Sequence, residues 1–251
     1  MATLIDLFHY DEYTTYSLEK LITDYAGISL NHCLQTSLEN TNIVQQLLNS
    51  KADMNSNYGF ALRRSCSIGY TETVRLLLKF GATTSIYGSS PEDIVFDNTV
   101  ELACRGGHIE IVKILIEAKP NNIDLNNGLK KASEHGHTEL IPLLIQAKAD
   151  VSTGNNIPIC NASENGHIEI VKHLIEAKAD IRAQDNYPLR RACRSGNGDM
   201  IKLLLELKAD LIPIYHKLVN YAWNKEQTHV IEILDQEMKK LGRLRRLIKN
   251  K

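Results

Sequence analysis

A twelve-residue phrase occurs twice in this chain, and the duplication limits the folds open to it. HIEIVKILIEAK occupies residues 108–119 and HIEIVKHLIEAK occupies residues 167–178, so the copies match at eleven of twelve positions and lie 59 residues apart. An active site needs different groups converging on one point, whereas a copied segment places the same groups at two points. The duplication therefore indicates a repeat architecture, in which similar units stack on one another.

A nearly constant period extends this duplication along the chain. Taking Gly166 as the reference, the equivalent positions are Glu39, Gly69, Gly107, Gly136, Gly196 and Glu226. The steps between neighbouring positions are 30, 38, 29, 30, 30 and 30 residues. Five of the six steps are 29 or 30 residues, so the period predicts seven modules of similar structure.

Each module has the apolar spacing of two short helices. In the first stretch a small residue such as Ala162 follows an apolar one such as Ile159 at a spacing of three, which suits one helix face. The second stretch has apolar pairs at i, i+1, i+4 and i+5, as at 170–175, which form one helical stripe. One such unit cannot bury both helices alone, so we expect neighbouring modules to stack.

The wording of these modules resembles the ankyrin repeat. ASENGHIEIVKHLIEAKAD at 162–180, with related runs at 132–150 and 192–210, carries the resemblance, which covers roughly residues 28–238. It implies an all-α, ankyrin-type helix-turn-helix solenoid of about six repeats plus terminal caps, with short hairpin loops. The expected division is an N-terminal capping segment at 1–27, repeats at 28–215, and a C-terminal capping repeat with a basic tail at 216–251. A looser similarity links the wording to ankyrin proteins of large amoeba-infecting DNA viruses.

The chain departs from the family pattern at the end of the second helix. The glycine expected there is replaced by Lys51, Lys148, Lys178 and Lys208, and remains only at Gly81. A left-handed backbone at these lysines would cost roughly 1–2 kcal/mol each. The sequence leaves two alternatives: these modules end their helices differently, or the favourable position of a cation at a helix C-terminus offsets part of the cost.

Composition and motifs exclude several classes of function. The net charge is −1, no apolar run approaches a membrane helix, and the five cysteines form no CxxC pair. His108, His137 and His167 recur at one module position, too far apart to hold one metal ion, and we expect them to hydrogen-bond at the inter-helix turn. Cys66, Cys104 and Cys193 also share one position, which predicts small buried side chains. We expect no catalytic residue, metal or cofactor, and no enzyme activity.

The resemblance implies a scaffold or adaptor that binds a partner protein on the concave surface formed by the first helices and loop tips. The exposed positions just before the reference glycine vary between modules, as a specific surface requires. We expect the partner to contact Arg63, Arg64, Ser67, Tyr87, Ser89, Ser90, Arg105, Lys130, Glu134, His135, Glu164, Asn165, Tyr187, Arg190 and Arg194. Several of these are basic, so an acidic partner surface is expected. Tyr87, Ser89 and Ser90 lie in the longer connection at 82–98, which is either a functional finger or a tolerated insertion.

Two terminal segments leave alternatives open. The tail KKLGRLRRLIKNK at 239–251 has seven basic residues, which favours either a frayed helix end or a contact with nucleic acid or an anionic membrane surface. The first 25 residues hold five aromatic side chains, which fits either a cap over the end of the stack or a recognition surface. The cysteine content favours a reducing, intracellular setting in the cytoplasm, that of the host cell if the protein is viral, with the nucleus as an alternative.

Overall fold

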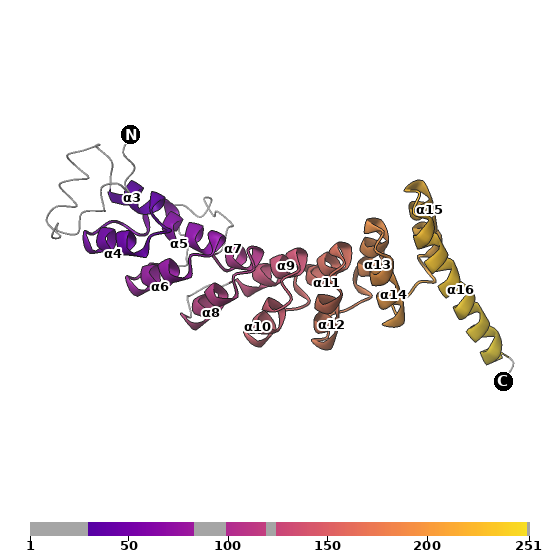
Figure 1. The fold of residues 1–251 in the computed structure, drawn as a ribbon. Coiled ribbons are helices and arrows are strands. Elements are labelled where there is room, and N and C mark those ends of the chain that lie inside the picture. The colour runs from indigo at the N-terminus through magenta and orange to yellow at the C-terminus, as the bar shows by residue number, and fades with distance from the viewer. Residues whose placement is uncertain (1–29, 83–98, 119–123, 250–251) are drawn as a thin grey trace. The chain divides into compact units, whose positions relative to one another are not determined.

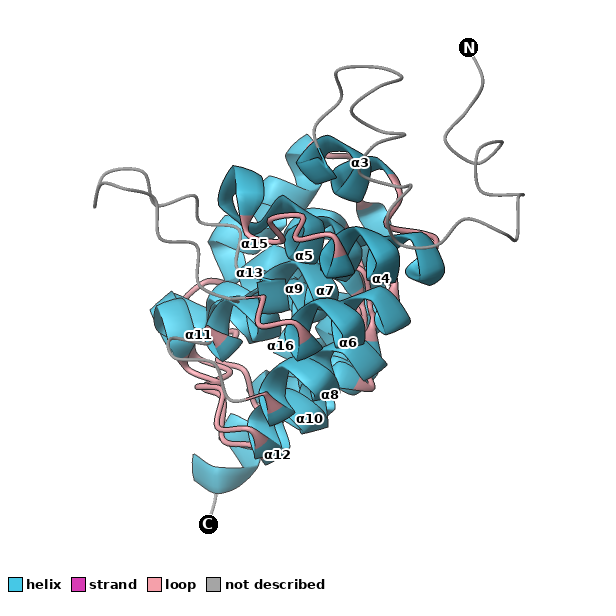
Figure 2. Ribbon diagram, turned by 90° about the vertical axis from the view of Figure 1, so that its left-hand side faces the viewer, coloured by secondary structure: helices cyan, strands magenta, loops and turns pink. Residues whose placement is uncertain are grey.

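The described residues form helices joined by short connections. The computed structural model describes residues 30–82, 99–118 and 124–249, apart from the side chains at 58 and 243–249. Within these ranges no strand occurs, as Figure 2 shows. The first helices of the seven pairs are α3 (Leu30–Thr36), α5 (Ser56–Ile68), α7 (Thr99–Arg105), α9 (Leu125–His135), α11 (Thr153–Asn165), α13 (Ala183–Ser195) and α15 (Tyr215–Asn224). The second helices are α4 (Thr41–Asn49), α6 (Thr71–Lys79), α8 (Ile109–Glu117), α10 (Leu140–Gln146), α12 (Ile168–Glu176), α14 (Gly198–Glu206) and α16 (Thr228–Lys249).

The seven helix pairs match the seven modules of the period, and the all-α repeat fold is confirmed. The chain forms two compact units, residues 1–123 and 124–251. Within each unit the first helices pack side by side, α3 on α5 on α7 and α9 on α11 on α13 on α15 (Figure 1). The second helices pack likewise, α4 with α6, α6 with α8, α10 with α12 and α14 with α16. The duplicated segments at 108–119 and 167–178 contain two of these second helices, α8 and α12.

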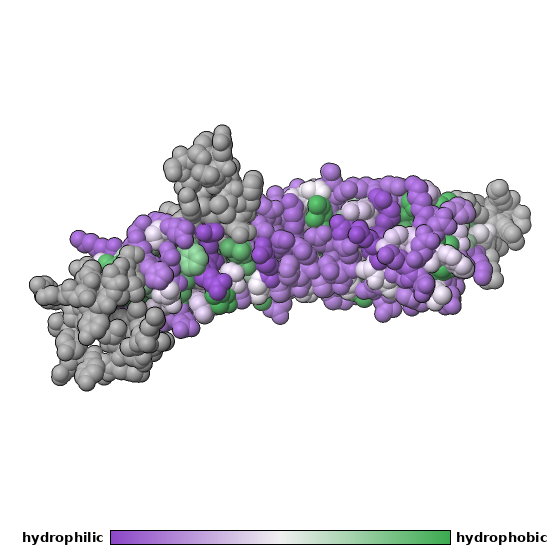
Figure 3. Space-filling model, turned by 90° about the horizontal axis from the view of Figure 1, so that it is seen from above, coloured by the Kyte–Doolittle hydropathy of each residue, from purple (hydrophilic) through white to green (hydrophobic). Residues whose placement is uncertain are grey.

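The apolar stripes of the helices are buried where neighbouring modules stack. In α12 the side chains of Ile170, Val171 and Leu174 are fully buried, while Glu169 and Lys172 are exposed and form an ion pair at 2.7 Å. Figure 3 shows hydrophilic residues over most of the face in view, with hydrophobic ones in small separate patches. Burial of these stripes is the main stabilising contribution, at about 25 cal/mol for each Å² of apolar surface removed from water.

A left-handed turn precedes the first helix in two modules. Gln184, Asp185 and Asn186 all have φ between 51° and 58°, and 154–156 repeat the same conformation. The right-handed helix therefore begins after Asn186, so Pro188 lies in its first turn, where a missing N–H leaves no helical hydrogen bond unmade. Three consecutive left-handed residues are costly, although Asn and Asp tolerate this region better than most residues.

An asparagine at the start of the first helix closes each of four helix pairs, and in two of them it belongs to the left-handed turn. The Oδ1 atom of Asn186 accepts a hydrogen bond from the backbone N–H of Asp210 at 2.7 Å, and Asn156 accepts one from Asp180 at 2.8 Å. Asn126 and Asn31 make the same bond to Asp150 and Asp53, each at 2.7 Å. The acceptor always lies before the first helix or in its first turn, and the donor lies beyond the second helix. We call this contact the asparagine clasp.

The lysines that replace glycine adopt the left-handed conformation. Lys51, Lys148, Lys178 and Lys208 have φ of 64°, 76°, 72° and 67°. At Lys178 the N–H donates to the Ile175 carbonyl, and the N–H of Ala179 donates to the Leu174 carbonyl, each at 2.9 Å. These two bonds form a Schellman motif, so the helices end as the family's glycine-containing ones are expected to. The first alternative left open by the sequence is therefore wrong for these four helices, and the offset from a cation at the helix C-terminus stays a prediction.

The turn between the two helices is closed by the next module. His108 Nε2 lies 3.1 Å from the carbonyl oxygen of Ser67, and His167 Nε2 lies 3.1 Å from that of Glu134, so each ring nitrogen donates. The predicted structural role is confirmed for these two histidines. A Cβ added to Gly136 would lie 2.7 Å from the His167 ring, so this glycine is required both by its φ of 82° and by its neighbour.

Two predictions concern residues outside the described ranges. The N-terminal capping segment at 1–27 and most of the connection at 82–98 lie there, as do Tyr87, Ser89 and Ser90. The C-terminal pair α15 and α16 corresponds to the predicted capping repeat, and Tyr215 donates a hydrogen bond to Asp235 at 2.5 Å to join its helices. The proposed boundaries at 27 and 215 remain predictions.

Candidate protein interface on the first helices of residues 124–251

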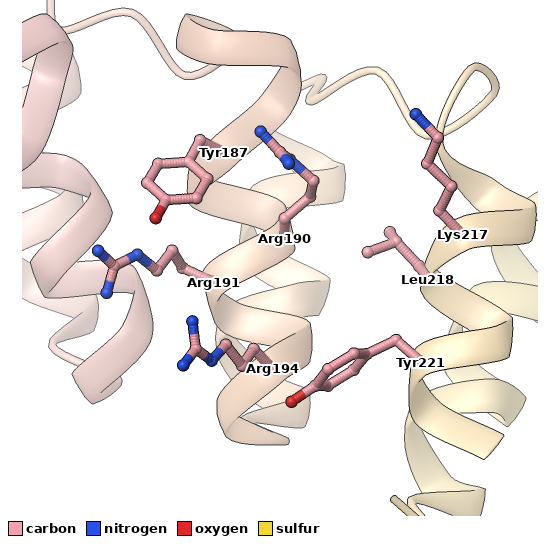
Figure 4. Close-up of a pocket in the computed structure, with 7 residues that line it drawn as sticks. All are labelled: Tyr187, Arg190, Arg191, Arg194, Lys217, Leu218 and Tyr221. Carbon is pink, nitrogen blue, oxygen red and sulfur yellow. The ribbon is translucent and has the colours of Figure 1, made fainter. Parts of the chain in front are cut away.

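A pocket of about 260 Å³ lies between two adjacent first helices, α13 and α15. Figure 4 shows its lining: Tyr187, Arg190, Arg191 and Arg194 project from α13, and Lys217, Leu218 and Tyr221 project from α15. We call this site the arginine pocket. The four α13 residues share a site because the spacing 187, 190, 191 and 194 follows one face of a helix.

An aromatic ring orients two of the arginines. The guanidinium carbons of Arg190 and Arg191 each lie 4.9 Å from the centroid of the Tyr187 ring. At this distance each cation is attracted to the ring by about 0.5–1 kcal/mol in a partly exposed site. Tyr187 therefore limits the freedom of both guanidinium groups before any partner binds.

The hydrogen bonds of these arginines leave positive charge uncompensated. Arg191 forms an ion pair with Glu164 of α11, whereas Arg190 donates only to the neutral carbonyl of Gln184, at 2.6 Å. The Nε atoms of both arginines are buried and have no hydrogen-bond partner within the described chain. Arg194 and Lys217 are exposed and form no ion pair with any described residue. Three of the four cations thus lack a carboxylate partner in the described structure.

The opposite wall is less polar. Leu218 is 4% exposed, and Tyr221 is half-buried. Neither the lining of α13 nor that of α15 contributes a carboxylate. The pocket therefore combines three arginines of α13 and one lysine of α15 with the apolar and aromatic surface of Leu218 and Tyr221, and arginine and aromatic residues are enriched at protein interfaces.

The other predicted contact residues of this unit lie on neighbouring first helices. Lys130 donates to Asn127 at 3.1 Å, and Glu134 pairs with Lys131 at 3.0 Å. His135 is exposed, and Asn165 is exposed and donates to the carbonyl of Asn161 at 3.0 Å. Of these side chains only Glu134 is compensated by an opposite charge, and together they provide a mixed polar surface on α9 and α11.

The predicted contact residues of residues 1–123 form no pocket of this kind among the described ones. Arg64 is exposed, and Arg63 is half-buried, with Nη2 3.5 Å from the Asn57 carbonyl. Arg105 is exposed and lies 3.6 Å from Glu101. Ser67 is half-buried and its carbonyl accepts from His108. The structure therefore brings together Tyr187, Arg190 and Arg194 from the predicted set and places the arginines of the other unit elsewhere.

The described residues offer little for catalysis or metal binding. Within the described ranges no group of three His, Cys, Asp or Glu side chains is placed to hold a metal ion. All five cysteines are buried and unpaired. Burial raises the pKa of Cys66, Cys104 and Cys193 to about 12, so these thiols stay protonated and unreactive at neutral pH. Burial also raises the pKa of Cys160, to about 11, although Arg191 and Arg190 oppose that shift.

Comparison with known families decides what these repeats are. The family described as ankyrin repeats (3 copies) matches residues 30–128 and 129–213, which is most of the chain. The chain belongs to the ankyrin repeat family. No curated protein matches it. Ankyrin repeats generally mediate protein–protein interaction and generally lack catalytic activity. Among the described residues no helix of this ankyrin protein meets the length and hydropathy that crossing a membrane would require.

The sequence analysis did not predict four of the seven residues that line the arginine pocket. The predicted contact residues include neither Arg191 of α13 nor Lys217, Leu218 and Tyr221 of α15. The sequence of the last module differs from that of the other repeats, so the repeat pattern did not identify Lys217 or Tyr221 as exposed positions. Their position in the period could have identified them. Residues 217, 218 and 221 lie nine, eight and five positions before the reference residue Glu226. Residues 187, 188 and 191 lie at the same distances before Gly196.

Proposed function

We propose that this protein is a non-catalytic scaffold or adaptor that binds an acidic segment of a partner protein in the arginine pocket. The observation that carries the proposal is the cluster of Arg190, Arg194 and Lys217, which have no carboxylate partner among the described residues, beside the half-buried rings of Tyr187 and Tyr221. Arginine and tyrosine are enriched in the residues that dominate binding energy at protein interfaces. Uncompensated cations also favour an anionic partner and increase the rate at which it associates.

A comparison of partner recovery between surface variants tests the proposal. Immobilised protein is exposed to extract from cells of its source, and one recovered protein is quantified for each variant. We expect Arg190→Ala combined with Arg194→Ala to reduce its recovery at least about tenfold, because two charge-assisted contacts are lost. The matched control is Lys172→Ala combined with Lys202→Ala, which removes two exposed cations from second helices of the same unit.

The controls separate binding from folding. Each variant must keep the thermal midpoint of the wild type within a few degrees, since surface substitutions usually change stability by less than about 0.5 kcal/mol. Equal recovery by the pocket variant and the wild type would remove the arginine pocket as the binding surface. Equal loss in both double variants would show a response to net charge alone, and it would also count against this site.

The alternative function is a contact with nucleic acid or an anionic membrane surface through the basic tail at 239–251. The described part of that tail shows Lys240 paired with Glu237 at 3.0 Å, and Lys239 exposed. This compensation favours the protein partner over the tail alternative. The setting we propose is a reducing one, in the cytoplasm or the host-cell cytoplasm, because five buried free thiols persist best where thiols stay reduced. The similarity to viral ankyrin proteins remains a prediction.

A further inference from the structure

We propose that the arginine pocket binds a phosphorylated tyrosine side chain of the partner protein. This inference rests on the proposed function, since it names the group that the partner inserts. Three observations carry it: the number of uncompensated charges, the prior orientation of the arginines and the aromatic character of the opposite wall.

The charge of the pocket suits a dianion. Within the part of the chain that the structure describes, Arg190, Arg194 and Lys217 have no carboxylate partner, while Arg191 is compensated by Glu164. A single carboxylate would bring one negative charge to three cations. A phosphoryl group carries a charge of about −1.5 to −2 at pH 7 and has three strong acceptor oxygens. It therefore compensates the pocket more completely than an aspartate or glutamate side chain does.

The arginines are placed for a planar, multidentate contact. The stacking of Arg190 and Arg191 on Tyr187 orients both guanidinium groups in the free protein. An arginine fork matches the geometry of phosphate oxygens, and orientation before binding lowers the entropy lost when the contact forms. Arg194 lies one helical turn from Arg190, and its exposed side chain must turn toward Arg190, away from the direction seen in Figure 4, for both to contact one phosphoryl group.

The volume of the pocket and its α15 side suit a single aromatic side chain. A volume of about 260 Å³ is below the range of about 300–1,000 Å³ usual for drug-sized ligands, so it suits one side chain better than a nucleotide. Leu218 and Tyr221 of α15 offer an apolar and aromatic surface opposite the arginines of α13 (Figure 4). A phosphotyrosine ring can pack there while its phosphoryl group reaches the cations. A phosphoserine side chain has no ring to make that contact.

Fluorescence anisotropy with the full chain tests the inference. Four peptides share neutral Gly and Ser flanks and a neutral dye, and differ only in a central phosphotyrosine, phosphoserine, tyrosine or glutamate. We expect the phosphotyrosine peptide to bind about tenfold or more tightly than the tyrosine and glutamate peptides, from charge-assisted hydrogen bonds. We expect it to bind about fivefold more tightly than the phosphoserine peptide, from the ring contact.

Variants of the protein test the cationic part and the aromatic part of the site separately. Arg194→Ala combined with Lys217→Ala should weaken binding of both phosphopeptides about tenfold. Tyr221→Ala should weaken the phosphotyrosine peptide and leave the phosphoserine peptide unchanged, which a general loss of folding would not do. Lys202→Ala is the matched control and should change neither. The inference is overturned by equal binding of phosphotyrosine and tyrosine peptides, by phosphoserine binding as tightly as phosphotyrosine, or by an unchanged affinity in the Arg194 and Lys217 variant.

Treating the extract with a tyrosine phosphatase separates this inference from the proposed function. If recovery of the partner falls after treatment and depends on Arg190 and Arg194, both are supported. If recovery depends on these arginines but not on treatment, the phosphotyrosine inference fails and the protein-binding function stands. If recovery depends on neither, the proposed function fails as well.

Discussion

At the scale of single residues, the chain places lysine where the backbone favours glycine. Lys178 has φ of 72° and completes a Schellman motif, so its backbone conformation is fixed by hydrogen bonds that any residue there would make. A left-handed conformation costs a residue with a Cβ atom about 1–2 kcal/mol, while glycine loses about 0.5–1 kcal/mol through its greater freedom in the unfolded chain. The two effects leave a net advantage for glycine.

Lys178→Gly should therefore stabilise the protein by about 0.5–1 kcal/mol. The measurement is the midpoint of urea unfolding followed by circular dichroism, at unchanged slope. Lys172→Gly provides the contrast, because Lys172 lies inside α12, where glycine should destabilise by about 1 kcal/mol. A lower midpoint for Lys178→Gly than for the wild type would show that the lysine side chain contributes more than its backbone conformation costs.

Two separate factors require glycine at position 166, the reference position of the period: its backbone conformation and the side chain next to it. Gly166 has φ of 78°, and a Cβ there would lie 2.0 Å from Nδ2 of Asn197, whose Oδ1 caps α14 by accepting from Met200 at 3.0 Å. We expect Gly166→Ala to cost about 2–3 kcal/mol, the backbone cost together with loss of the cap. Adding Asn197→Gly, which keeps a tolerated N-cap, should recover about 1 kcal/mol. Chemical denaturation of the wild type, both single variants and the double variant checks the coupling, and strict additivity would exclude the contact.

At the scale of elements, each helix pair is closed by the asparagine clasp as well as by apolar packing. Asn186 is 5% exposed, so its amide oxygen and the Asp210 N–H exchange their bonds to water for one another. Leaving either group buried and unpaired costs about 1–3 kcal/mol. The clasp therefore fixes the returning chain at the end of one pair against the start of the same pair.

Asn186→Ala should increase the hydrogen-exchange rate of the Asp210 amide and lower stability by about 2 kcal/mol. Asn186→Asp is the matched variant, since it keeps both the acceptor oxygen and a tolerance for the left-handed region, and it should retain most of the protection. Exchange followed by NMR measures both effects. Unchanged protection of the Asp210 amide in Asn186→Ala would mean that the clasp contributes nothing to closing the pair.

The elements show where sequence reasoning succeeds and where it stops. The helix pairs and the buried stripe of 170–175 followed from spacing, and the roles of His108 and His167 followed from their repeated position. The left-handed turn at 184–186 did not, because it consists of polar residues that are equally common in ordinary turns. The asparagine clasp carried a detectable signal, an Asn 24 residues before three of the Lys-Ala-Asp aspartates and 22 before Asp53, but only the geometry shows that the two residues bond.

At the scale of the whole molecule, two compact units each stack their own repeats, and the arginine pocket belongs to residues 124–251. Stability in such arrays is close to a sum of repeat and interface contributions. The pocket depends on α13 and α15 together, so its lining is complete only when the last repeat is in place. This dependence explains how a diverged terminal repeat can contribute to recognition as well as to capping.

Removal of 243–251 distinguishes the pocket from the basic tail. These residues follow the last described side chain of α16 and include five of the seven tail cations. We expect the truncated protein to recover the same partner to the same extent, with the same dependence on salt, because the pocket is intact. A steep loss of binding together with a weaker salt dependence would instead support the nucleic-acid or membrane alternative.

Site-specific photo-crosslinking tests most directly whether the first-helix face of residues 124–251 is the binding surface. A photoreactive amino acid replaces either Tyr221, on the wall of the arginine pocket, or Lys202, on the second-helix side of the same unit. We expect one discrete adduct from position 221 that disappears when Arg194→Glu is added, and none from position 202. An adduct from position 202 alone, or one from 221 that persists with Arg194→Glu, would contradict binding through this pocket.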